Sequence, residues 1–317
     1  MDERATLTLI FGCTGSGKGS LAFELAQRTG GEIISIDSMK VYRRMDIGTA
    51  KPSREVRRCV RHHLIDVVEP SEEFSVAEYV RLAQDAIADI QARGRPIFVV
   101  GGTPLYIKAL SEGLFEGPGA NPEIRARLVD SAKTNGHDLL YDQLRRVDPV
   151  AAERIHPNDL RRIVRALEVH ELTGQPISSL QRQWDQTQRC YNCLFFGLRR
   201  TREDQGQRTN ERVRRMMADG FVDEVRSLLN EPLPMSTAAG QALGYAEIIR
   251  HLQGELSLTE TVELIKVNTR RFAKAQRTWF RRFRETEWID VSSESSASQL
   301  ADDLLHRRES LWSLLPK

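Results

Sequence analysis

Short apolar runs alternate with helical patterns along the first third of the chain. Amphipathic spacing predicts helices over residues 20–28 and 76–93. Strands are predicted over five apolar runs, residues 6–11, 32–36, 96–100, 194–198 and 288–291. Strands that alternate with helices form a parallel sheet with helices on both faces. The pattern therefore predicts an α/β fold.

The pattern changes after a cluster of helix-breaking residues at 117–122. From there to about residue 188 the chain is helical and charged, and residues 201–283 are again mostly helical. We therefore predict a helical insertion domain over residues 119–189. The α/β core would then comprise residues 1–118 and 190–317, with helices near its C-terminus.

Composition limits the class of protein. The chain has 317 residues, 40% of them hydrophobic, which is enough apolar surface to offset the entropy of ordering the chain. It contains no run of ~18 apolar residues that could span a membrane. The start, Met1-Asp2-Glu3-Arg4, lacks the basic region and cleavage site of a signal peptide. We expect a cytoplasmic protein.

The cysteines and histidines give little sign of a metal site. Cys190 and Cys193 have metal-like spacing, but no second Cys or His pair lies at the distance typical of a zinc ribbon. We interpret them as ordinary thiols. His62 and His63 have no carboxylate partner that the spacing identifies, so a structural role is favoured for both.

Basic residues cluster near the C-terminus. The net charge is only +2, and a GC-rich genome would explain the excess of Arg over Lys. Residues 266–284, however, hold eight basic side chains and no acid. On a helix, one face would carry Arg270, Lys274, Arg277, Arg281 and Arg284, and the other Phe272, Trp279 and Phe283. An acid-free face favours a nucleic-acid partner over an ordinary solvated helix.

A glycine-rich loop follows the first predicted strand. It reads Gly12, Cys13, Thr14, Gly15, Ser16, Gly17, Lys18, Gly19, Ser20. Between a strand and a helix, such a loop curls its backbone N–H groups around a phosphate, and Lys18 reaches the outer oxygens. The alternative is a chance glycine-rich turn. The residue after Lys18 is Gly19 rather than the usual Mg²⁺-binding Ser or Thr, and Ser20 follows, as in adenylate kinases.

The acids nearest to this loop differ from those of an NTP-hydrolysing enzyme, which holds Mg²⁺ with a carboxylate at the end of a neighbouring strand. The strand at 96–100 ends instead in Gly101-Gly102-Thr103, and the carboxylate that does appear is Asp37, after the second strand. This arrangement suits a diphosphate leaving group, with Asp37 as general base for the incoming nucleophile. The alternative is a structural aspartate that caps the next segment.

At residues 37–52 the sequence, DSMKVYRRMDIGTAKP, resembles the signature of the tRNA dimethylallyltransferases, also called tRNA isopentenyltransferases. Further similar segments follow in the order typical of that family, over roughly residues 6–290. They lie at 63–66, 99–106, 154–159, 165–168, 244–245, 269–276 and 278–281. An ordered set of this kind is far more specific than an isolated phosphate loop.

The resemblance implies a P-loop kinase-like sheet with a helical insertion that grips the anticodon stem-loop of tRNA. It implies transfer of a dimethylallyl group from dimethylallyl diphosphate to N6 of the adenosine next to the anticodon. Asp37 would be the base, Thr103 would assist the diphosphate loop, and Arg208 would neutralise the departing diphosphate. The residues expected to contact tRNA are Asp37, Ser38, Met39, Lys40, Thr103, Arg125, Asp159, Leu160, Arg161, Arg162, Ile163, Gly244, Tyr245, Arg270, Lys274, Gln276, Arg277 and Arg281.

Three positions depart from the pattern usual in the family. Lys40 replaces a common Gln, Ala275 a common Arg, and Gly19 a common Ser or Thr. We therefore expect Mg²⁺ to be held mainly by diphosphate and water, with Ser20 as the alternative side-chain ligand. The expected enzyme is a bacterial-type monomer with no membrane attachment.

Two other classes of protein compete with this interpretation. A nucleotide or small-molecule kinase would share the fold and the phosphate loop, because fold does not fix function, but it leaves the basic segment unexplained. A non-catalytic RNA-binding protein leaves the phosphate loop and Asp37 unexplained.

Overall fold

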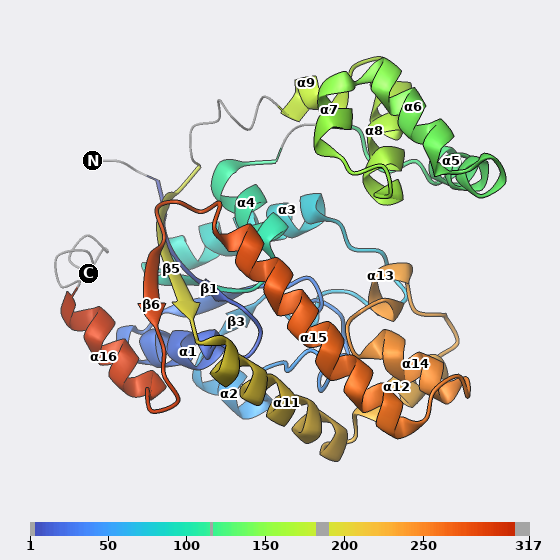
Figure 1. The fold of residues 1–317 in the computed structure, drawn as a ribbon. Coiled ribbons are helices and arrows are strands. Elements are labelled where there is room, and N and C mark those ends of the chain that lie inside the picture. Colours follow the sequence, from blue (N-terminus) through green and yellow to red (C-terminus); the bar gives the residue numbers. More distant parts are fainter. Residues whose placement is uncertain (1–3, 115–116, 182–189, 308–317) are drawn as a thin grey trace. The chain divides into compact units, whose positions relative to one another are not determined.

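The computed structural model describes residues 4–114, 117–181 and 190–307, and the chain divides into two compact units (Figure 1). The first unit combines residues 1–111 with 190–317, and the second comprises residues 112–189. The segment that forms the second unit is thus inserted between β4 and β5 of the first unit's sheet.

The first unit is built on a six-stranded sheet whose pairings are all parallel. Its order is β3-β2-β4-β1-β5-β6, so β4 lies between β1 and β2. The strands are β1 (Thr6–Gly12), β2 (Glu32–Ile36), β3 (His62–His63), β4 (Ile97–Gly101), β5 (Asn192–Arg199) and β6 (Glu287–Asp290). The prediction of a parallel α/β sheet of the P-loop kinase-like kind is confirmed.

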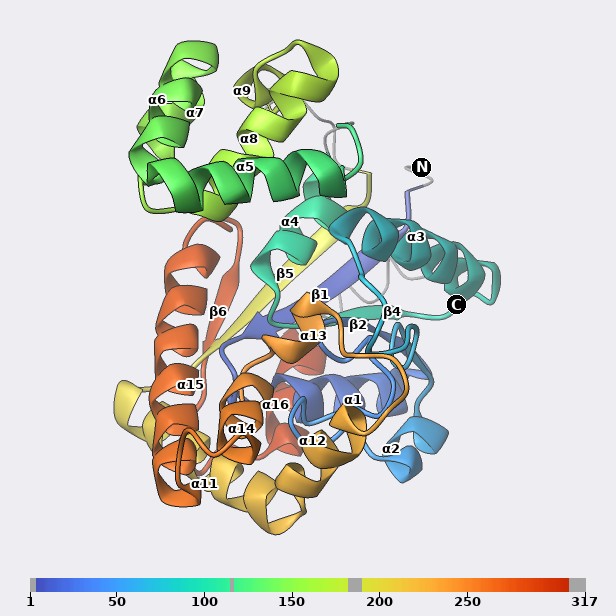
Figure 2. The same ribbon diagram turned by 90° about the vertical axis from the view of Figure 1, so that its right-hand side faces the viewer.

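Alternate side chains of β1 enter different cores, because successive residues of a strand point to opposite faces. Leu9 packs in a core with α3 (Val76–Ala92), α4 (Pro104–Glu112) and α15 (Leu258–Phe280). Ile10 packs in a second core with α1 (Lys18–Thr29) and α16 (Ala297–Arg307). The sheet is therefore covered on both faces (Figure 2).

The C-terminal helices of the first unit form a third core around the segment after β2. Val41, Tyr42 and Met45 are almost fully buried there. The other bounds in this unit are α2 (Arg54–Cys59), α11 (Arg202–Ala218), α12 (Phe221–Leu229), α13 (Thr237–Gly240) and α14 (Tyr245–Leu252). Helices α11, α12, α14 and α15 contribute to this core, which fixes the segment to the helical layer.

The second unit has its own apolar core and two buried carboxylates, Asp148 and Glu168. Its helices are α5 (Pro122–Asn135), α6 (His137–Val147), α7 (Pro149–Arg154), α8 (Leu160–Thr173) and α9 (Ile177–Gln181). Glu168 of α8 is fully buried and accepts hydrogen bonds from the guanidinium groups of Arg125, at 2.8 and 3.1 Å, and Arg165, at 2.6 Å. It also accepts one from the Asn121 backbone N–H. These bonds tie the start of α5 to α8.

Three details of the structure differ from the sequence predictions. Helix α15 ends at Phe280, so Arg281 and Arg284 follow the helix instead of extending its face. Phe272 was expected on the core side but is 46% exposed, and Ala273, Gln276 and Phe280 form the buried stripe. His63 does have a carboxylate partner: its Nε2 lies 2.7 Å from Glu32 Oε2. Glu32 is 31 residues distant in sequence, which is why spacing did not identify it.

We expect the Glu168→Gln substitution to destabilise the second unit. Removing one partner of a buried ion pair leaves the other charges uncompensated, which costs about 3–5 kcal/mol, and the partial exposure of both arginines favours the lower end. The measurement is urea unfolding together with hydrogen exchange in α8. The control is Glu171→Gln, whose partner Arg127 is exposed and which should cost less than about 1 kcal/mol. Equal stability of the two variants would contradict this account of Glu168.

Candidate active site

Three strand ends create the site. In a parallel sheet the carboxyl ends of neighbouring strands meet at one edge, where ligands bind. Strand β1 ends in the glycine-rich loop, β4 ends in Gly101-Gly102-Thr103, and β2 ends one residue before Asp37. Because β4 lies between the other two strands, the Gly-Gly-Thr turn separates the loop from Asp37.

Side chains from the β5–α11 region hold the loop by its carbonyl groups. Gln205 Nε2 donates to Thr14 O, Arg208 Nε to Gly15 O at 3.1 Å, and Arg200 Nε to Ser16 O at 3.1 Å. Gly15 and Gly17 adopt φ values of 75° and 95°, which glycine tolerates without strain. The loop is thus preorganised at the N-terminus of α1, where the helix dipole favours an anion.

Positive charge dominates around the loop. Burial, with smaller contributions from Lys40 and Arg212, lowers the pKa of Lys18 to about 8, and nearby Asp37 opposes this shift. Burial likewise lowers the pKa of Lys40 and of Arg212. The charged forms of these three side chains are therefore destabilised in the empty site. An anion that binds there stabilises them.

Asp37 lies in a turn fixed by its own carboxylate and by Thr103. Its Oδ1 accepts the Met39 backbone N–H at 2.9 Å, and the next residue's N–H, that of Ser38, donates to Thr103 Oγ1 at 3.1 Å. Thr103 N in turn donates to Ile36 O. Asp37 therefore both caps the turn that follows it and lies near the phosphate loop. Among the hydrogen bonds that the structure gives, none involves its second oxygen, Oδ2.

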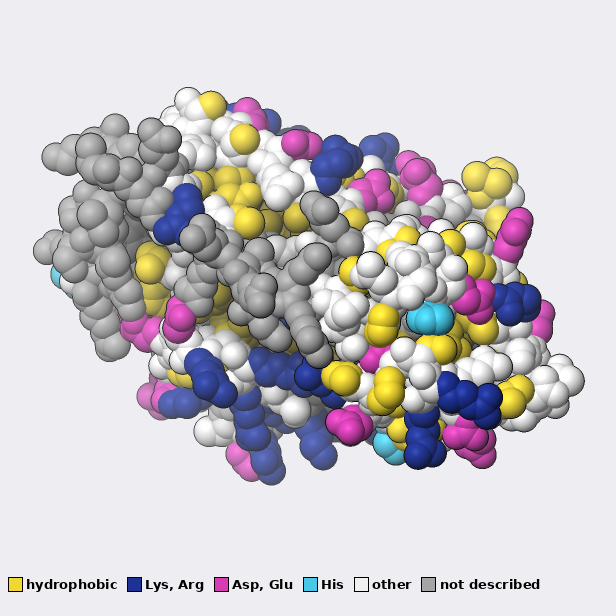
Figure 3. Space-filling view, turned by 90° about the horizontal axis from the view of Figure 1, so that it is seen from above, with side chains coloured by type: hydrophobic (Ala, Val, Ile, Leu, Met, Phe, Trp, Pro, Cys, Tyr) yellow, Lys and Arg dark blue, Asp and Glu magenta, His cyan; other side chains and the backbone are white. Residues whose placement is uncertain are grey.

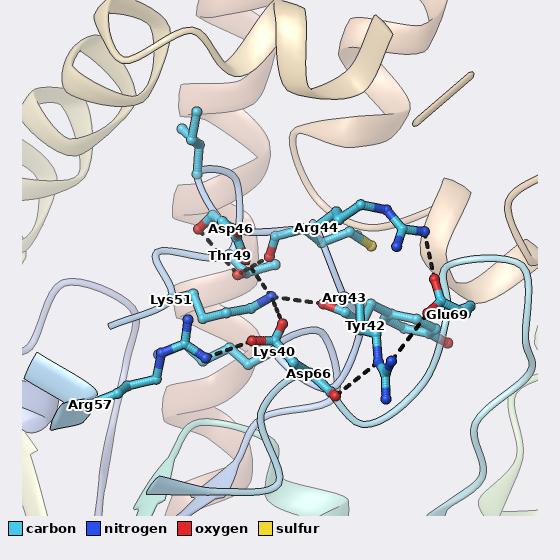
Figure 4. Close-up of polar contacts among 12 residues, drawn as sticks. Lys40, Tyr42, Arg43, Arg44, Asp46, Thr49, Lys51, Arg57, Asp66 and Glu69 are labelled. Atoms are coloured by element: carbon cyan, nitrogen blue, oxygen red, sulfur yellow. Dashed lines mark hydrogen bonds and ion pairs between the residues drawn. The ribbon is translucent and has the colours of Figure 1, made fainter. Parts of the chain in front are cut away.

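The segment after Asp37 is held by a buried lysine (Figure 4). Lys51, whose side chain is 1% exposed, donates to Tyr42 O at 2.8 Å and pairs with Asp46 at 2.6 Å and Asp66 at 2.7 Å. Arg57 adds a contact to Asp66 at 2.6 Å. This network stabilises a segment in which Arg44 and Ala50 adopt left-handed backbone angles, which are costly for residues with a Cβ.

Glu224 of α12 holds the same segment from the other side. Its carboxylate accepts the backbone N–H groups of Ile47 at 2.7 Å and Gly48 at 3.2 Å. It also accepts the Tyr245 hydroxyl at 2.6 Å. Tyr245 is fully buried, and burial raises its pKa. Gly244 is buried as well, and a Cβ there would lie 2.7 Å from the Phe221 ring.

The basic residues of α15 occupy different environments. Arg270 and Lys274 are exposed, and Arg270 donates to Asn210 Oδ1 of α11 at 2.9 Å. Arg277 is partly buried beside the Cys13 thiol, whose pKa is nevertheless raised because burial outweighs the nearby positive charges. Arg281 is exposed just beyond the helix. The basic residues therefore extend from the phosphate loop to the solvent.

Basic side chains of the second unit are mostly paired. Asp159 caps α8 and lies 3.3 Å from Arg162, while Leu160 packs on the unit's core. Arg161 and Arg162 are exposed, and Arg125 bonds Glu168 as described. In the view of Figure 3, Lys and Arg side chains have Asp and Glu among them. The acid-free stretch of α15 differs from this mixed pattern.

Three residues predicted to contact tRNA have buried side chains in this structure. Ile163 lies in the core of the second unit and Tyr245 in the third core of the first. Gln276 is 4% exposed, and its amide bonds only the protein interior. The resemblance named these positions as contacts, but a motif does not state which of its side chains face inward.

Sequence reasoning also missed residues that shape the site. Gln205, Arg200 and Glu224 bond backbone groups far away in sequence, and Lys51 bonds the carbonyl of Tyr42 within its own segment. Only Lys51 lay within a recognised motif, and nothing in the local pattern distinguishes the others. Among the described residues no group of three or more His, Cys, Asp or Glu could hold a metal ion, and no described helix is long and apolar enough to cross a membrane.

Comparison with known proteins gives consistent matches. The family model described as IPP transferase matches residues 40–283. A "tRNA dimethylallyltransferase" of Geobacter metallireducens is 50% identical over 91% of this chain and 94% of its own. The crystal structure of a tRNA isopentenylpyrophosphate transferase from Bacillus halodurans has a TM-score of 0.70 and 38% identity, covering 98% and 99% of the two chains. A eukaryotic dimethylallyltransferase described as acting on tRNA has a TM-score of 0.80 and 28% identity, covering 98% and 84%.

The pKa of Lys18 makes anion binding depend on pH. Above about pH 8 the empty site holds a neutral lysine, so binding of inorganic diphosphate must take up a proton and weakens as pH rises. Lys18→Ala should cost about 1.5–3 kcal/mol at pH 7, as expected for a charged hydrogen bond. By pH 9 the advantage of wild type over the variant should shrink about tenfold.

Calorimetric titration with inorganic diphosphate between pH 6.5 and 9.5 measures this effect. The ionisation of diphosphate affects the dissociation constants of wild type and of the Lys18→Ala variant equally. The ratio of the two constants therefore does not depend on it. A ratio that stays constant across this range would rule out Lys18 as the titrating group.

Proposed function

The chain belongs to the IPP transferase family, and we propose that it transfers a dimethylallyl group from dimethylallyl diphosphate to N6 of the adenosine next to the anticodon of tRNA. Prenyl transfer to tRNA follows from membership of the family. The donor, the acceptor atom and the role of each residue are inferred from the chemistry of the site.

One observation carries this proposal. An anion site made by the β1 loop and a carboxylate at the end of β2 lie at the same sheet edge, separated by a turn that bears no acid. That arrangement suits displacement of a diphosphate by a nucleophile that must lose a proton. A kinase would place a metal-holding carboxylate where this chain has Gly101-Gly102-Thr103. The relatives do not favour that alternative.

The donor's diphosphate would lie in the loop from Gly12 to Ser20. Backbone N–H groups and Lys18 bind its oxygens, and Thr103 adds a hydroxyl from the neighbouring strand end. Arg208 already bonds the loop at Gly15 O, so its terminal nitrogens are available to neutralise the departing diphosphate. The loop thereby stabilises the charge that develops as the allylic C–O bond breaks.

The acceptor needs a base because the adenine N6 lone pair is delocalised into the ring. As N6 attacks the allylic carbon and the C–O bond to diphosphate breaks, Asp37 accepts the N6 proton. The adenosine must leave its stack to reach the site. Ser38, Met39 and Lys40 follow Asp37 directly and would contact the base, and the buried lysine and Glu224 hold this segment in place.

Mg²⁺ fits this site only as an ion carried by the donor. The loop has Gly19 after Lys18, and the described residues offer no cluster of acidic or histidine ligands. Diphosphate oxygens and water would therefore hold the ion, with the exposed Ser20 as the alternative side-chain ligand. When bound, Mg²⁺ neutralises part of the leaving group's charge.

The tRNA anticodon stem-loop would contact exposed basic residues. In the first unit these are Arg270, Lys274 and Arg281, with the partly buried Arg277 beside them. In the second unit they are Arg125, Arg161 and Arg162, near the helix start at Asp159 and Leu160. Their exposure and charge support phosphate contacts. A purely RNA-binding protein would have no use for the preorganised anion loop. We further propose that the enzyme acts as a monomer in the cytoplasm.

Asp37→Asn should slow the chemical step. The amide keeps the shape and a hydrogen-bonding oxygen but cannot take a proton, and general-base catalysis contributes about 10²–10⁴-fold. The rate constant should fall by that order, while tRNA affinity stays within about threefold because no positive charge is altered. Single-turnover assays with dimethylallyl diphosphate and tRNA, followed by nucleoside mass analysis, measure it.

Two outcomes would contradict the assignment of Asp37. A near-normal rate constant in the Asn variant would exclude the base role. Loss of tRNA binding with normal chemistry at saturation would make Asp37 a recognition residue. In the same assay, wild-type enzyme that forms ADP from ATP but no prenylated adenosine would overturn the proposed function.

Replacing Arg270 and Lys274 together with Ala should weaken tRNA binding and reduce its salt dependence. Each phosphate contact releases counterions, so the slope of log affinity against log salt should lose roughly two units of magnitude. Filter binding from 50 to 300 mM salt measures the slope. Replacing Arg81 and Arg226, which are exposed but already paired with aspartates, is the control and should leave the slope unchanged. An unchanged slope in the first variant would exclude the phosphate contacts.

A further inference from the structure

A single buried amide bridges the two sides of the reaction centre. Gln276 extends from α15 into the interior and is 4% exposed. Its Nε2 donates to Gly102 O at 2.6 Å, and its Oε1 accepts the Thr14 backbone N–H at 3.1 Å. One side chain therefore connects the phosphate loop to the turn that ends β4.

The Gly-Gly-Thr turn also holds the segment that carries Asp37. Thr103, next to Gly102, accepts the Ser38 N–H at 3.1 Å through its Oγ1, and Ser38 is adjacent to Asp37. A continuous path of hydrogen bonds and covalent bonds thus runs from Thr14 through Gln276, Gly102 and Thr103 to Ser38. This path connects the diphosphate loop to the segment that carries the proposed base, Asp37.

We propose that Gln276 is a positioning residue that sets the separation between the diphosphate loop and Asp37. The nucleophile and the leaving group must lie in line across the allylic carbon, and a misplacement of about 1 Å can cost about 10² in rate. Gln276 touches neither substrate. It acts through the backbone of Thr14 and of Gly102, whose position decides where the donor and the base lie. This inference rests on the proposed function.

The close packing at Gly102 shows that the amide is seated firmly. A Cβ on Gly102 would lie 2.6 Å from Gln276 Nε2 and 3.4 Å from Gly12 O, so no side chain fits between the turn and the amide. A methionine at 276 would match the length of glutamine but leave a carbonyl and an N–H unpaired. The loop and the turn would then be free to separate by a fraction of an ångström.

The test compares Gln276→Met with Gln205→Met. Gln205 also bonds Thr14, through the carbonyl, but none of the hydrogen bonds given for the described residues joins it to the Gly-Gly-Thr turn. For Gln276→Met we expect a single-turnover rate constant 10- to 100-fold lower, roughly the cost of such a misplacement, at saturating donor and tRNA. The affinity for inorganic diphosphate should change less than about threefold, because the anion groups remain. Gln205→Met should instead weaken the binding of inorganic diphosphate, because Gln205 holds the loop that binds the anion.

The results separate this inference from the proposed function. Wild-type enzyme that forms no prenylated adenosine overturns the function. Active wild type with a normal rate constant in Gln276→Met overturns the positioning role, as does a loss confined to diphosphate affinity. If the methionine variant fails to fold by circular dichroism, Gln276→Glu decides, because it keeps the acceptor for Thr14 N–H and replaces the donor to Gly102 O by a charged acceptor that repels this carbonyl. It should show the same rate loss, and a normal rate would overturn the proposal.

Discussion

Close approach of backbone at the carboxyl end of β4 is the constraint on which the site depends. A Cβ on Gly101 would lie 2.2 Å from Ile36 O, and one on Gly102 would meet Gln276. Because both positions are glycine, β4 fits tightly between β1 and β2, and the strand ends carry their loops close to one another. A phosphate loop and a carboxylate that α1 and β2 separate in sequence then lie at the same edge of the sheet.

Around these strand ends, supporting side chains hold the phosphate loop and the segment after Asp37 by hydrogen bonds to their backbone groups. Gln205, Arg208 and Arg200 hold three successive carbonyls of the phosphate loop. Lys51 and Glu224 hold the segment after Asp37 by a carbonyl and by N–H groups. Lys18 and Lys40 lie near Asp37 at this site, and burial lowers the pKa of each, with smaller contributions from neighbouring cations. The empty site is electrostatically strained, and binding of a diphosphate relieves the strain.

The two proposed substrates are bound by different physical means. The proposed donor would meet a loop that three side chains hold by its carbonyl groups, beside the partly buried Lys18. The tRNA would meet exposed arginines and lysines. These contacts are numerous, but salt screens each of them. Helix α15 takes part in both, because Arg270 and Lys274 face the solvent while Gln276 reaches the loop. The hydrogen bond between Gln276 and Thr14 thereby joins the helix to the loop.

The sequence alone determined the parallel α/β class, the phosphate loop and Asp37, because alternating apolar runs and glycine spacing are local properties of the chain. It also located the acid-free basic segment. Only the tertiary structure decided which motif residues face outward: Tyr245, Ile163 and Gln276 proved to be buried, and Phe272 exposed. It likewise revealed Glu32 beside His63 and Gln205 at Thr14, contacts across 31 and 191 residues. Such partners are chosen by how the strands and helices pack, and no local periodicity encodes that choice.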